Sequence, residues 1–214
     1  MNRYVQWMND WAYKRDGFIR RWRAQRMEEL IERVGLRSGQ RVIDLGGTEF
    51  MWRLVDVDVH VTLVNTPGSG TEVSDPDRFE VVLGDACALD EFGDRSFDLA
   101  FSNSVIEHVG GAVREEAFAR EVRRVARSYW VQTPSDHFPL EAHTGVPFYW
   151  HLPERARARL LRRWRARSPD WAWAVETTTV LSLDRMRALF PDAEVFVERK
   201  LGFEKSYALY RRED

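Results

Sequence analysis

Four groups of polar or small residues stand where short apolar runs of this sequence end. They are Asp44-Leu45-Gly46-Gly47, Asn65, Gly84-Asp85-Ala86 and Ser102-Asn103-Ser104. Glycine lets a ligand approach the backbone closely, an amide can bond sugar hydroxyls, and a carboxylate can accept a hydrogen bond from an adenine amino group. A nucleoside with an amino-acid tail requires this combination.

Strands alternating with helices or loops would position these groups. The apolar runs predict strands over 41–45, 59–64, 79–83, 129–132 and within 96–102, with helices over 50–55 and 113–125. Such alternation indicates a mostly parallel sheet covered on both faces. In a doubly wound sheet the carboxyl ends of the strands line one crevice, so we expect the four groups to converge there.

The rest of the chain frames this core. Residues 3–34 have apolar spacing typical of helices, with a break at Gly17, and 135–180 form a stretch rich in Pro, His, Trp and Arg without a βα unit. A helix is predicted over 183–189, where Ser182 can cap its start. Two strands, 194–198 and 205–210, are separated by Gly202 and predict an antiparallel edge pair.

Composition limits the class of protein. The 214 residues are enough for one domain with a full core, and the net charge of -2 does not favour nucleic acid or membrane. A single cysteine, Cys87, excludes an internal disulfide framework and a cysteine-rich zinc site. The sequence has neither an amino-terminal signal pattern nor an apolar run that would span a bilayer, so we expect a soluble, cytoplasmic protein.

Segments 42–47, 84–86 and 96–109 resemble the class I S-adenosylmethionine-dependent methyltransferases, and 121–134 resembles the helix and strand that follow in that family. The resemblance implies an α/β, three-layer, doubly wound sheet of seven strands in the order 3-2-1-4-5-7-6, with the last strand antiparallel. It would be a single methyltransferase domain over 1–214. Its parts would be N-terminal helices (1–38), a cofactor-binding core (39–134), a helical cap or lid after strand five (135–181), and a helix with an edge hairpin (182–214).

The same resemblance implies S-adenosylmethionine as cofactor, S-adenosylhomocysteine as product, and a set of binding residues. Asp44, Gly46 and Gly47 would contact the methionine portion, Asp85 the adenine amino group with the Ala86 backbone alongside, and Asn103 and Ser104 would lie beside the sulfonium. Asn65 would bond the ribose hydroxyls. Two positions depart from the family: Thr48 or Phe50 stands where a third glycine is common, and Asn65 replaces an acidic residue.

Each of these residues also has a purely structural interpretation. Asp44 could end its strand in a turn, Asp85 could cap its own loop, and Asn65 could begin the Thr-Pro-Gly turn. The pair Glu107-His108 could be a solvated start to the next helix or could lie near the transferred methyl group.

Histidines of the second half are the candidates for a catalytic base. An alcohol or phenol acceptor benefits from such a base, and we rank His143 first and His137 second, with His108 third. Glu141 could orient His143, or both could join His137 or His151 around a metal, although we expect none. The simplest alternative is that these residues only hold an aromatic lid in place.

Residues 154–167 contain seven arginines around Leu160, Leu161 and Trp164, which predicts a basic amphipathic helix. We favour the solvated side of a packed cap helix over contact with an anionic membrane or substrate. Trp7, Trp11 and Trp22 of the N-terminal helices could cover the crevice or form a homodimer face, and the sequence leaves the oligomeric state open.

Methyl transfer to a small molecule, on oxygen or nitrogen and by in-line displacement under the lid, is therefore the leading hypothesis. The alternatives are an RNA or other nucleic-acid methyltransferase, against which the near-neutral charge argues, and a non-catalytic protein that binds S-adenosylmethionine. The sequence does not identify the acceptor.

Overall fold

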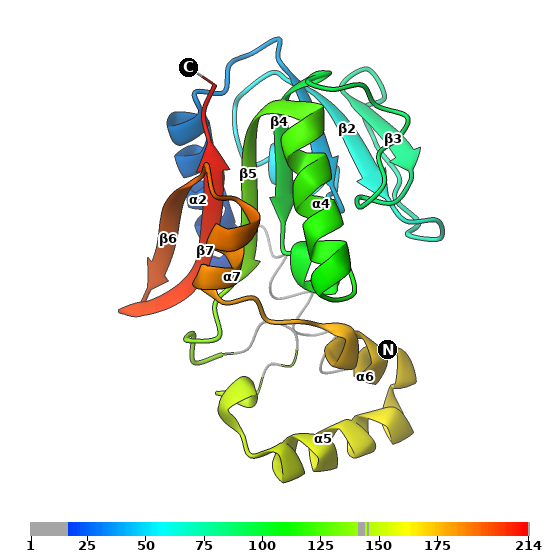
Figure 1. Ribbon diagram of the computed structural model, residues 1–214, viewed down its shortest axis with the longest axis vertical. Helices are drawn as coiled ribbons and strands as arrows, with labels where there is room; N and C mark the ends of the chain where they lie inside the picture. Colours follow the sequence, from blue (N-terminus) through cyan, green and yellow to red (C-terminus); the bar gives the residue numbers. More distant parts are fainter. Residues whose placement is uncertain (1–16, 141–143, 145, 214) are drawn as a thin grey trace.

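Runs of Val, Ile, Leu and Phe form the central strands, because such side chains fill a sheet that is covered on both faces. A computed structural model describes residues 17–140, 144 and 146–213 of the chain (Figure 1). Its central strands are β1 (Arg41–Leu45), β2 (His60–Asn65), β4 (Phe97–Asn103) and β5 (Ala126–Pro134). Every residue of β1 after Arg41 is buried.

The sheet has the order β3-β2-β1-β4-β5-β7-β6. β3 (Phe79–Leu83) forms one edge, and the hairpin of β6 (Glu194–Lys200) and β7 (Phe203–Arg211) forms the other. β7 runs antiparallel to both of its neighbours, whereas the pairs among β1 to β5 are parallel. The order and the antiparallel strand implied by the resemblance are thus confirmed.

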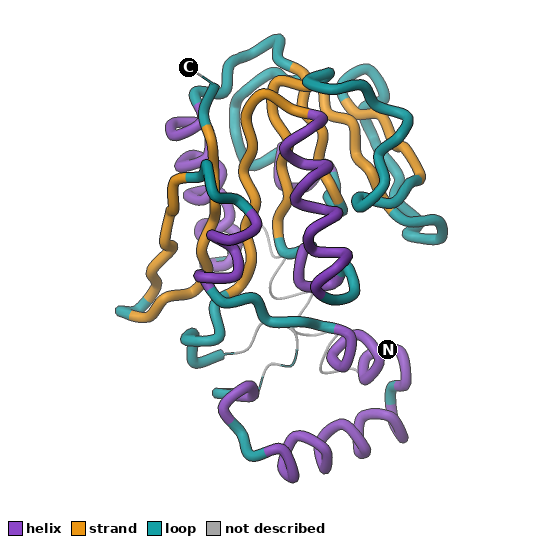
Figure 2. The backbone as a smooth tube through the Cα atoms, in the orientation of Figure 1, coloured by secondary structure: helices purple, strands orange, loops and turns teal. Residues whose placement is uncertain are grey.

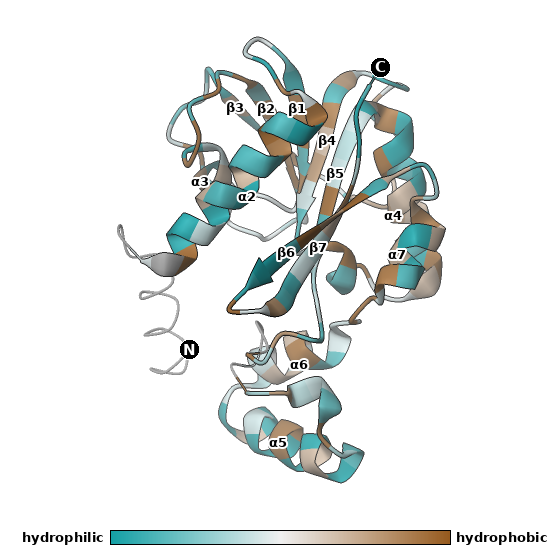
Figure 3. Cartoon of the chain, turned by 90° about the vertical axis from the view of Figure 1, so that its left-hand side faces the viewer, coloured by the Kyte–Doolittle hydropathy of each residue, from teal (hydrophilic) through white to brown (hydrophobic). Residues whose placement is uncertain are grey.

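One helical layer covers each face of the sheet (Figures 1 and 2). On one face α2 (Phe18–Val34) and α3 (Glu49–Trp52) pack through Met27, Leu30 and Trp52. On the other face α4 (Ala112–Val125) and α7 (Leu183–Leu189) pack through Phe118 and Met186. The side of α2 that faces away from the sheet is mostly hydrophilic (Figure 3).

Local signals fix the ends of several helices. α2 ends at Gly35, whose φ of 68° is left-handed and whose N–H bonds the carbonyl of Ile31. Ser182 caps α7 as predicted, because its Oγ accepts a hydrogen bond of 3.1 Å from the backbone N–H of Arg185. None of the described helices is long and apolar enough to cross a membrane.

α3 is shorter than the helix predicted over 50–55, because it ends at Trp52. The guanidinium of Arg78 explains this ending. Its Nη2 atom donates to the carbonyl of Trp52 at 3.3 Å and to that of Val57 at 2.7 Å. A longer helix would need the Trp52 carbonyl for its own ladder. β5 is longer than predicted, because it pairs with β4 from Ala126 onwards and with β7 as far as Pro134.

The segment that follows β5 forms a lid beyond the carboxyl ends of the parallel strands (Figure 1). Within residues 135–181 it contains a 3-10 turn, η2 (Tyr149–His151), and two helices, α5 (Glu154–Arg167) and α6 (Pro169–Thr177). The ring of Tyr149 is buried and lies 5.8 Å from that of Trp164, which joins η2 to α5. The predicted basic helix 154–167 coincides with α5.

Both ends of the lid are tied to the core by backbone hydrogen bonds, one to β7 and one to the turn η1 that follows β4. The N–H of Ser135 donates to the carbonyl of Lys205 at 3.1 Å, and the N–H of Thr179 donates to the carbonyl of Glu107 at 2.7 Å. The lid therefore leaves the core and returns to it at the same edge of the sheet.

Candidate functional site

Asp44 places a fully buried carboxyl group in β1. The indole Nε1 of Trp52 donates to its Oδ2 at 2.8 Å, while its Oδ1 is buried without a hydrogen-bond partner among the described residues. Burial raises the pKa of Asp44 to about 7, although the bond from Trp52 opposes that rise. The site thus contains an acceptor that can receive a hydrogen bond from a ligand.

The loop after β1 requires its two glycines. Gly46 has a φ of +75°, and a Cβ at this position would lie 2.6 Å from Cγ2 of Val105. A Cβ on Gly47 would lie 2.0 Å from Oδ2 of Asp44, because the loop curls around that carboxyl group. Both distances are too short for real carbon contacts, so any side chain would close this cradle.

The cradle and the unpartnered carboxyl oxygen fit the amino-acid tail of S-adenosylmethionine. The tail carries a cationic amino group that can donate to Asp44, and backbone without side chains allows it to approach. Thr48 stands where a third glycine is common, and it adopts extended backbone (φ -137°) before α3, which demands no glycine.

Asn65 ends β2 and is joined to the loop after β1. Its Nδ2 atom donates to the carbonyl of Gly47 at 2.9 Å. The turn that follows closes from Ser69 N–H to the carbonyl of Thr66, so Asn65 does not begin it. With its nitrogen on the loop, Asn65 has its Oδ1 atom to offer a ribose hydroxyl.

Asp85 accepts hydrogen bonds from two parts of the chain. The backbone N–H of Cys87 donates to Oδ1 at 2.9 Å, which is the loop cap that the sequence allowed. Nη2 of Arg114 donates to Oδ1 at 2.7 Å and to Oδ2 at 2.9 Å. Burial raises the pKa of Asp85, but the donors together lower it by a larger amount. The net shift is therefore downward, and the carboxylate is charged. Ala86 packs its side chain against the core.

Asn103 and Ser104 end β4 beside the di-glycine loop and are held by polar side chains. Nη1 of Arg26, from α2, donates to Oδ1 of Asn103 at 2.6 Å. Ser104 adopts a left-handed φ of 59°, and its Oγ donates to Oε1 of Gln132 at 3.0 Å. The amide nitrogen of Asn103 is therefore the group oriented away from Arg26.

Glu107 and His108 belong to the 3-10 turn η1 (Ile106–His108). Of the two alternatives for this pair, the solvated one is wrong for Glu107. The turn carries its side chain beneath the end of β5, where it is 2% exposed and accepts a hydrogen bond of 3.1 Å from Oγ1 of Thr133. His108 is exposed, and its Nδ1 lies 3.3 Å from Oγ1 of Thr178, at the return of the lid.

The other candidate bases lie in the lid or outside the described residues. The His137 side chain is 67% exposed, with Nδ1 3.6 Å from Asp136 and 3.8 Å from Glu204. Nε2 of His151 lies 3.0 Å from the carbonyl of Asp136. Glu141 and His143 lie outside the described residues, so the base and metal interpretations that use them stay predictions.

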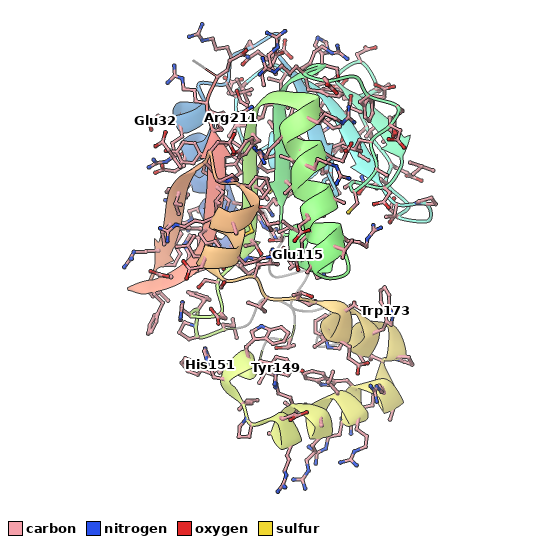
Figure 4. The ribbon with its side chains drawn as sticks, viewed as in Figure 1. Glu32, Glu115, Tyr149, His151, Trp173 and Arg211 are labelled. Atoms are coloured by element: carbon pink, nitrogen blue, oxygen red, sulfur yellow. The ribbon has the colours of Figure 1, made fainter. Side chains whose placement is uncertain are left out.

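Figure 4 places Tyr149, His151 and Trp173 on the lid. Trp173 is 69% exposed, so it is not a core residue, whereas Ala172 beside it is buried. The aromatic stretch of α6 therefore presents an indole to the surface of the lid.

Sequence reasoning missed two residues that shape the site, Arg114 and Arg26. Arg114 lies in the first turn of α4, and Arg26 lies in α2, where it is 5% exposed. A signal for Arg26 is its position four residues before the buried Leu30, which places an arginine on the apolar face of a mostly charged helix. No local pattern marks Arg114.

Comparison with known proteins agrees with this geometry. Residues 33–129 match a family model described as a methyltransferase domain. No curated protein sequence matches the chain. A structure of an S-adenosylmethionine-dependent methyltransferase from Aquifex aeolicus has 16% identity and a TM-score of 0.52, and the match covers 86% of this chain and 87% of that one.

A second structure is that of phosphoethanolamine N-methyltransferase 2 from Haemonchus contortus, in complex with phosphomonomethylethanolamine and S-adenosylhomocysteine. It has 16% identity and a TM-score of 0.56, and the match covers 81% of this chain and 38% of the other. At this identity the likeness concerns the fold.

Proposed function

We propose that this chain is a class I S-adenosylmethionine-dependent methyltransferase that methylates a small-molecule acceptor held between the strand ends and the lid, because residues 33–129 match the methyltransferase-domain model and the sheet has the strand order of that class. The observation that carries the proposal is the lid itself. It is attached to β7 through Ser135 and to η1, which follows β4, through Thr179. A cover fixed at both ends favours an acceptor of limited size.

The residues of the chain would act mainly by positioning. The bound cofactor supplies an electrophilic methyl group on its sulfonium. Asp44, the di-glycine loop, Asn65 and Asp85 would hold the donor, and the lid would exclude water and align the acceptor for in-line displacement. For an oxygen acceptor a base would also be required, with His143, His137 and His108 as candidates in that order. An amine acceptor would only need to arrive unprotonated.

Calorimetry with S-adenosylhomocysteine tests the cofactor site. We expect binding to the wild-type chain and weaker binding to Asp85→Ala. Asp90→Ala is the control, because Asp90 is exposed on the same loop. A chain that produces no heat at millimolar ligand would contradict the proposal. Methyl transfer from labelled S-adenosylmethionine to a panel of small alcohols, phenols and amines then tests turnover.

A nucleic-acid acceptor is the alternative that α5 raises. The helix carries seven arginines and has no buried residue. If it tracked a phosphate backbone, a gel shift with RNA would be strong at low salt and would weaken steeply as salt rises. We expect no shift at physiological salt, since Arg165 already pairs with Glu176 of α6 and the net charge of the chain is -2.

A further inference from the structure

Three cations of the chain share a single carboxylate at the edge of the sheet. Nε of Arg26 lies 2.9 Å from Oε2 of Glu198, and Nζ of Lys205 lies 3.5 Å from the same oxygen. Nζ of Lys200 lies 3.8 Å from the other oxygen. Glu198 is only 4% exposed, so these charges meet where water screens them poorly.

Arg23 adds a further positive charge and links this group to the cofactor loop. Its guanidinium stands 5.5 Å from the centre of the Phe50 ring, in the short helix after the di-glycine loop. Its charge also contributes to lowering the pKa of Lys205. We call Arg23, Arg26, Lys200 and Lys205 the cationic cluster.

The cationic cluster lies between the donor site and the lid. Arg26 bonds Asn103 at the end of β4, and the carbonyl of Lys205 accepts the hydrogen bond from Ser135 at which the lid begins. The ring of Trp22, one turn before Arg26 on α2, contacts Phe138 of the lid. Nζ of Lys205 lies over the same ring, 5.8 Å from its centre. An acceptor that enters beneath the lid would meet these side chains.

Lys205 brings a second cation to a carboxylate that Arg26 already binds. Arg26 and Glu198 are enough to tie α2 to β6, and Ser206 already donates to Glu198 at 2.7 Å. Burial and then the charge of Arg26 lower the pKa of Lys205 to about 7, although Glu198 opposes the shift. Arg26, Lys200 and Lys205 thus place three cations around this one carboxylate, so an additional anion beside Lys205 would be stabilised.

We propose that the cationic cluster binds an anionic oxygen group of the methyl acceptor, a carboxylate or a phosphate, through Lys205 and Arg23. The acceptor is therefore a small anion. The identification of this anion with the methyl acceptor rests on the proposed function. The anion site itself can be tested without turnover. Charge-assisted hydrogen bonds to two cations in a poorly solvated position would supply the selectivity.

Calorimetric titration of inorganic phosphate and of acetate tests the proposal, on the full chain both free and saturated with S-adenosylhomocysteine, at constant ionic strength. We expect one of the two anions to bind. Lys205→Gln and Arg23→Gln should each weaken that binding about tenfold, the loss of roughly one charge-assisted hydrogen bond. Arg21→Gln is the matched control, because Arg21 is exposed on the same helix.

Four outcomes decide between the interpretations. Failure of both anions to bind, or equal binding by Lys205→Gln, Arg23→Gln and the wild type, would overturn the proposal. Phosphate binding that S-adenosylhomocysteine abolishes would also overturn it, because the cluster would then hold the carboxylate of the cofactor. Retained affinity of each variant for S-adenosylhomocysteine shows that it is folded. If S-adenosylhomocysteine fails to bind the wild type while phosphate binds through Lys205, the proposed function fails and the anion site stands.

Discussion

The Nη2 atom of Arg114 lies 2.7 Å from one carboxylate oxygen of Asp85 and 2.9 Å from the other. One nitrogen thus fixes the orientation of the whole carboxylate, and Cys87 adds a backbone donor to the first oxygen. A carboxylate has about four acceptor positions, so this arrangement leaves room for an adenine amino group. Under the proposed function, Arg114 would therefore position Asp85 for the nucleoside without blocking it.

This relationship predicts a graded response of cofactor affinity. Asp85→Ala should weaken the binding of S-adenosylhomocysteine by roughly 10- to 100-fold, which corresponds to the loss of a hydrogen bond to a charged group. Arg114→Gln should weaken it less, because Cys87 still orients the carboxylate. In the double variant the loss of Arg114 should add nothing further. Arg120→Gln, on the exposed side of the same helix, is the control, and additive losses measured by calorimetry would show that Arg114 acts independently of Asp85.

The di-glycine loop predicts a large effect of a single methyl group. Gly46→Ala should lower the free energy of unfolding by about 2–4 kcal/mol, because it combines a left-handed φ with a clash against Val105. It should also abolish cofactor binding. Gly39→Ala is a matched control, since Gly39 has a φ of +86° with nothing within 4 Å of the added carbon. Gly39→Ala should lower the free energy of unfolding by only about 1 kcal/mol. Equal losses for the two variants in urea unfolding would refute the steric role of Val105.

Asp44 predicts a pH dependence of stability in the ligand-free chain. Because its pKa in the folded chain, about 7, lies above the ordinary 3.8, the folded chain holds more protons between these values. Its stability relative to that of Asp44→Asn should therefore fall as the pH rises from about 4 to about 7, by at most about 1.4 kcal/mol per pH unit. Urea unfolding of both chains across this range measures the difference. Parallel stability curves would show that Asp44 titrates normally.

The buried ion pair between Arg26 and Glu198 predicts the opposite dependence. Burial raises the pKa of Glu198, but Arg26 and Lys205 lower it below its ordinary value overall. Its charged form therefore stabilises the chain above about pH 4.5, and this contribution is lost as the pH falls. Glu198→Gln should lower the free energy of unfolding by about 3–5 kcal/mol at neutral pH, because it leaves Arg26 buried without its partner.

A double variant provides the control for this cost. Arg26→Met combined with Glu198→Leu should recover part of the lost stability in thermal or urea unfolding, since the guanidinium is then no longer buried without its partner, while Lys205 still lacks its carboxylate. If the double variant is less stable than Glu198→Gln alone, the loss comes from packing and not from the uncompensated guanidinium.

The strands and the groups at their ends were predictable because they depend on local pattern. Each apolar run is short, bounded by turn residues, and long enough to cross the sheet, so its end had to lie at the common edge. The length of α3 was not predictable, since it is set by Arg78, which lies 26 residues after the carbonyl of Trp52 that it binds.

The partners of the site residues were harder to predict for the same reason. Arg26 and Glu198 are 172 positions apart, and Asp85 and Arg114 are 29 apart. In a chain with 32 lysines and arginines, many cations could have met either carboxylate. A solvated Glu107 was one of two alternatives, since charged side chains are usually exposed, whereas the chain buries this carboxyl group against Thr133.

Both ends of the lid are bonded to the core, at Ser135 and Thr179, while Asp44, Asn65 and Asp85 all come from segments before it. The residues proposed to hold the donor and the lid proposed to cover the acceptor thus lie in separate stretches of the chain. A change within the lid that keeps both attachment points would therefore leave the proposed donor residues in place.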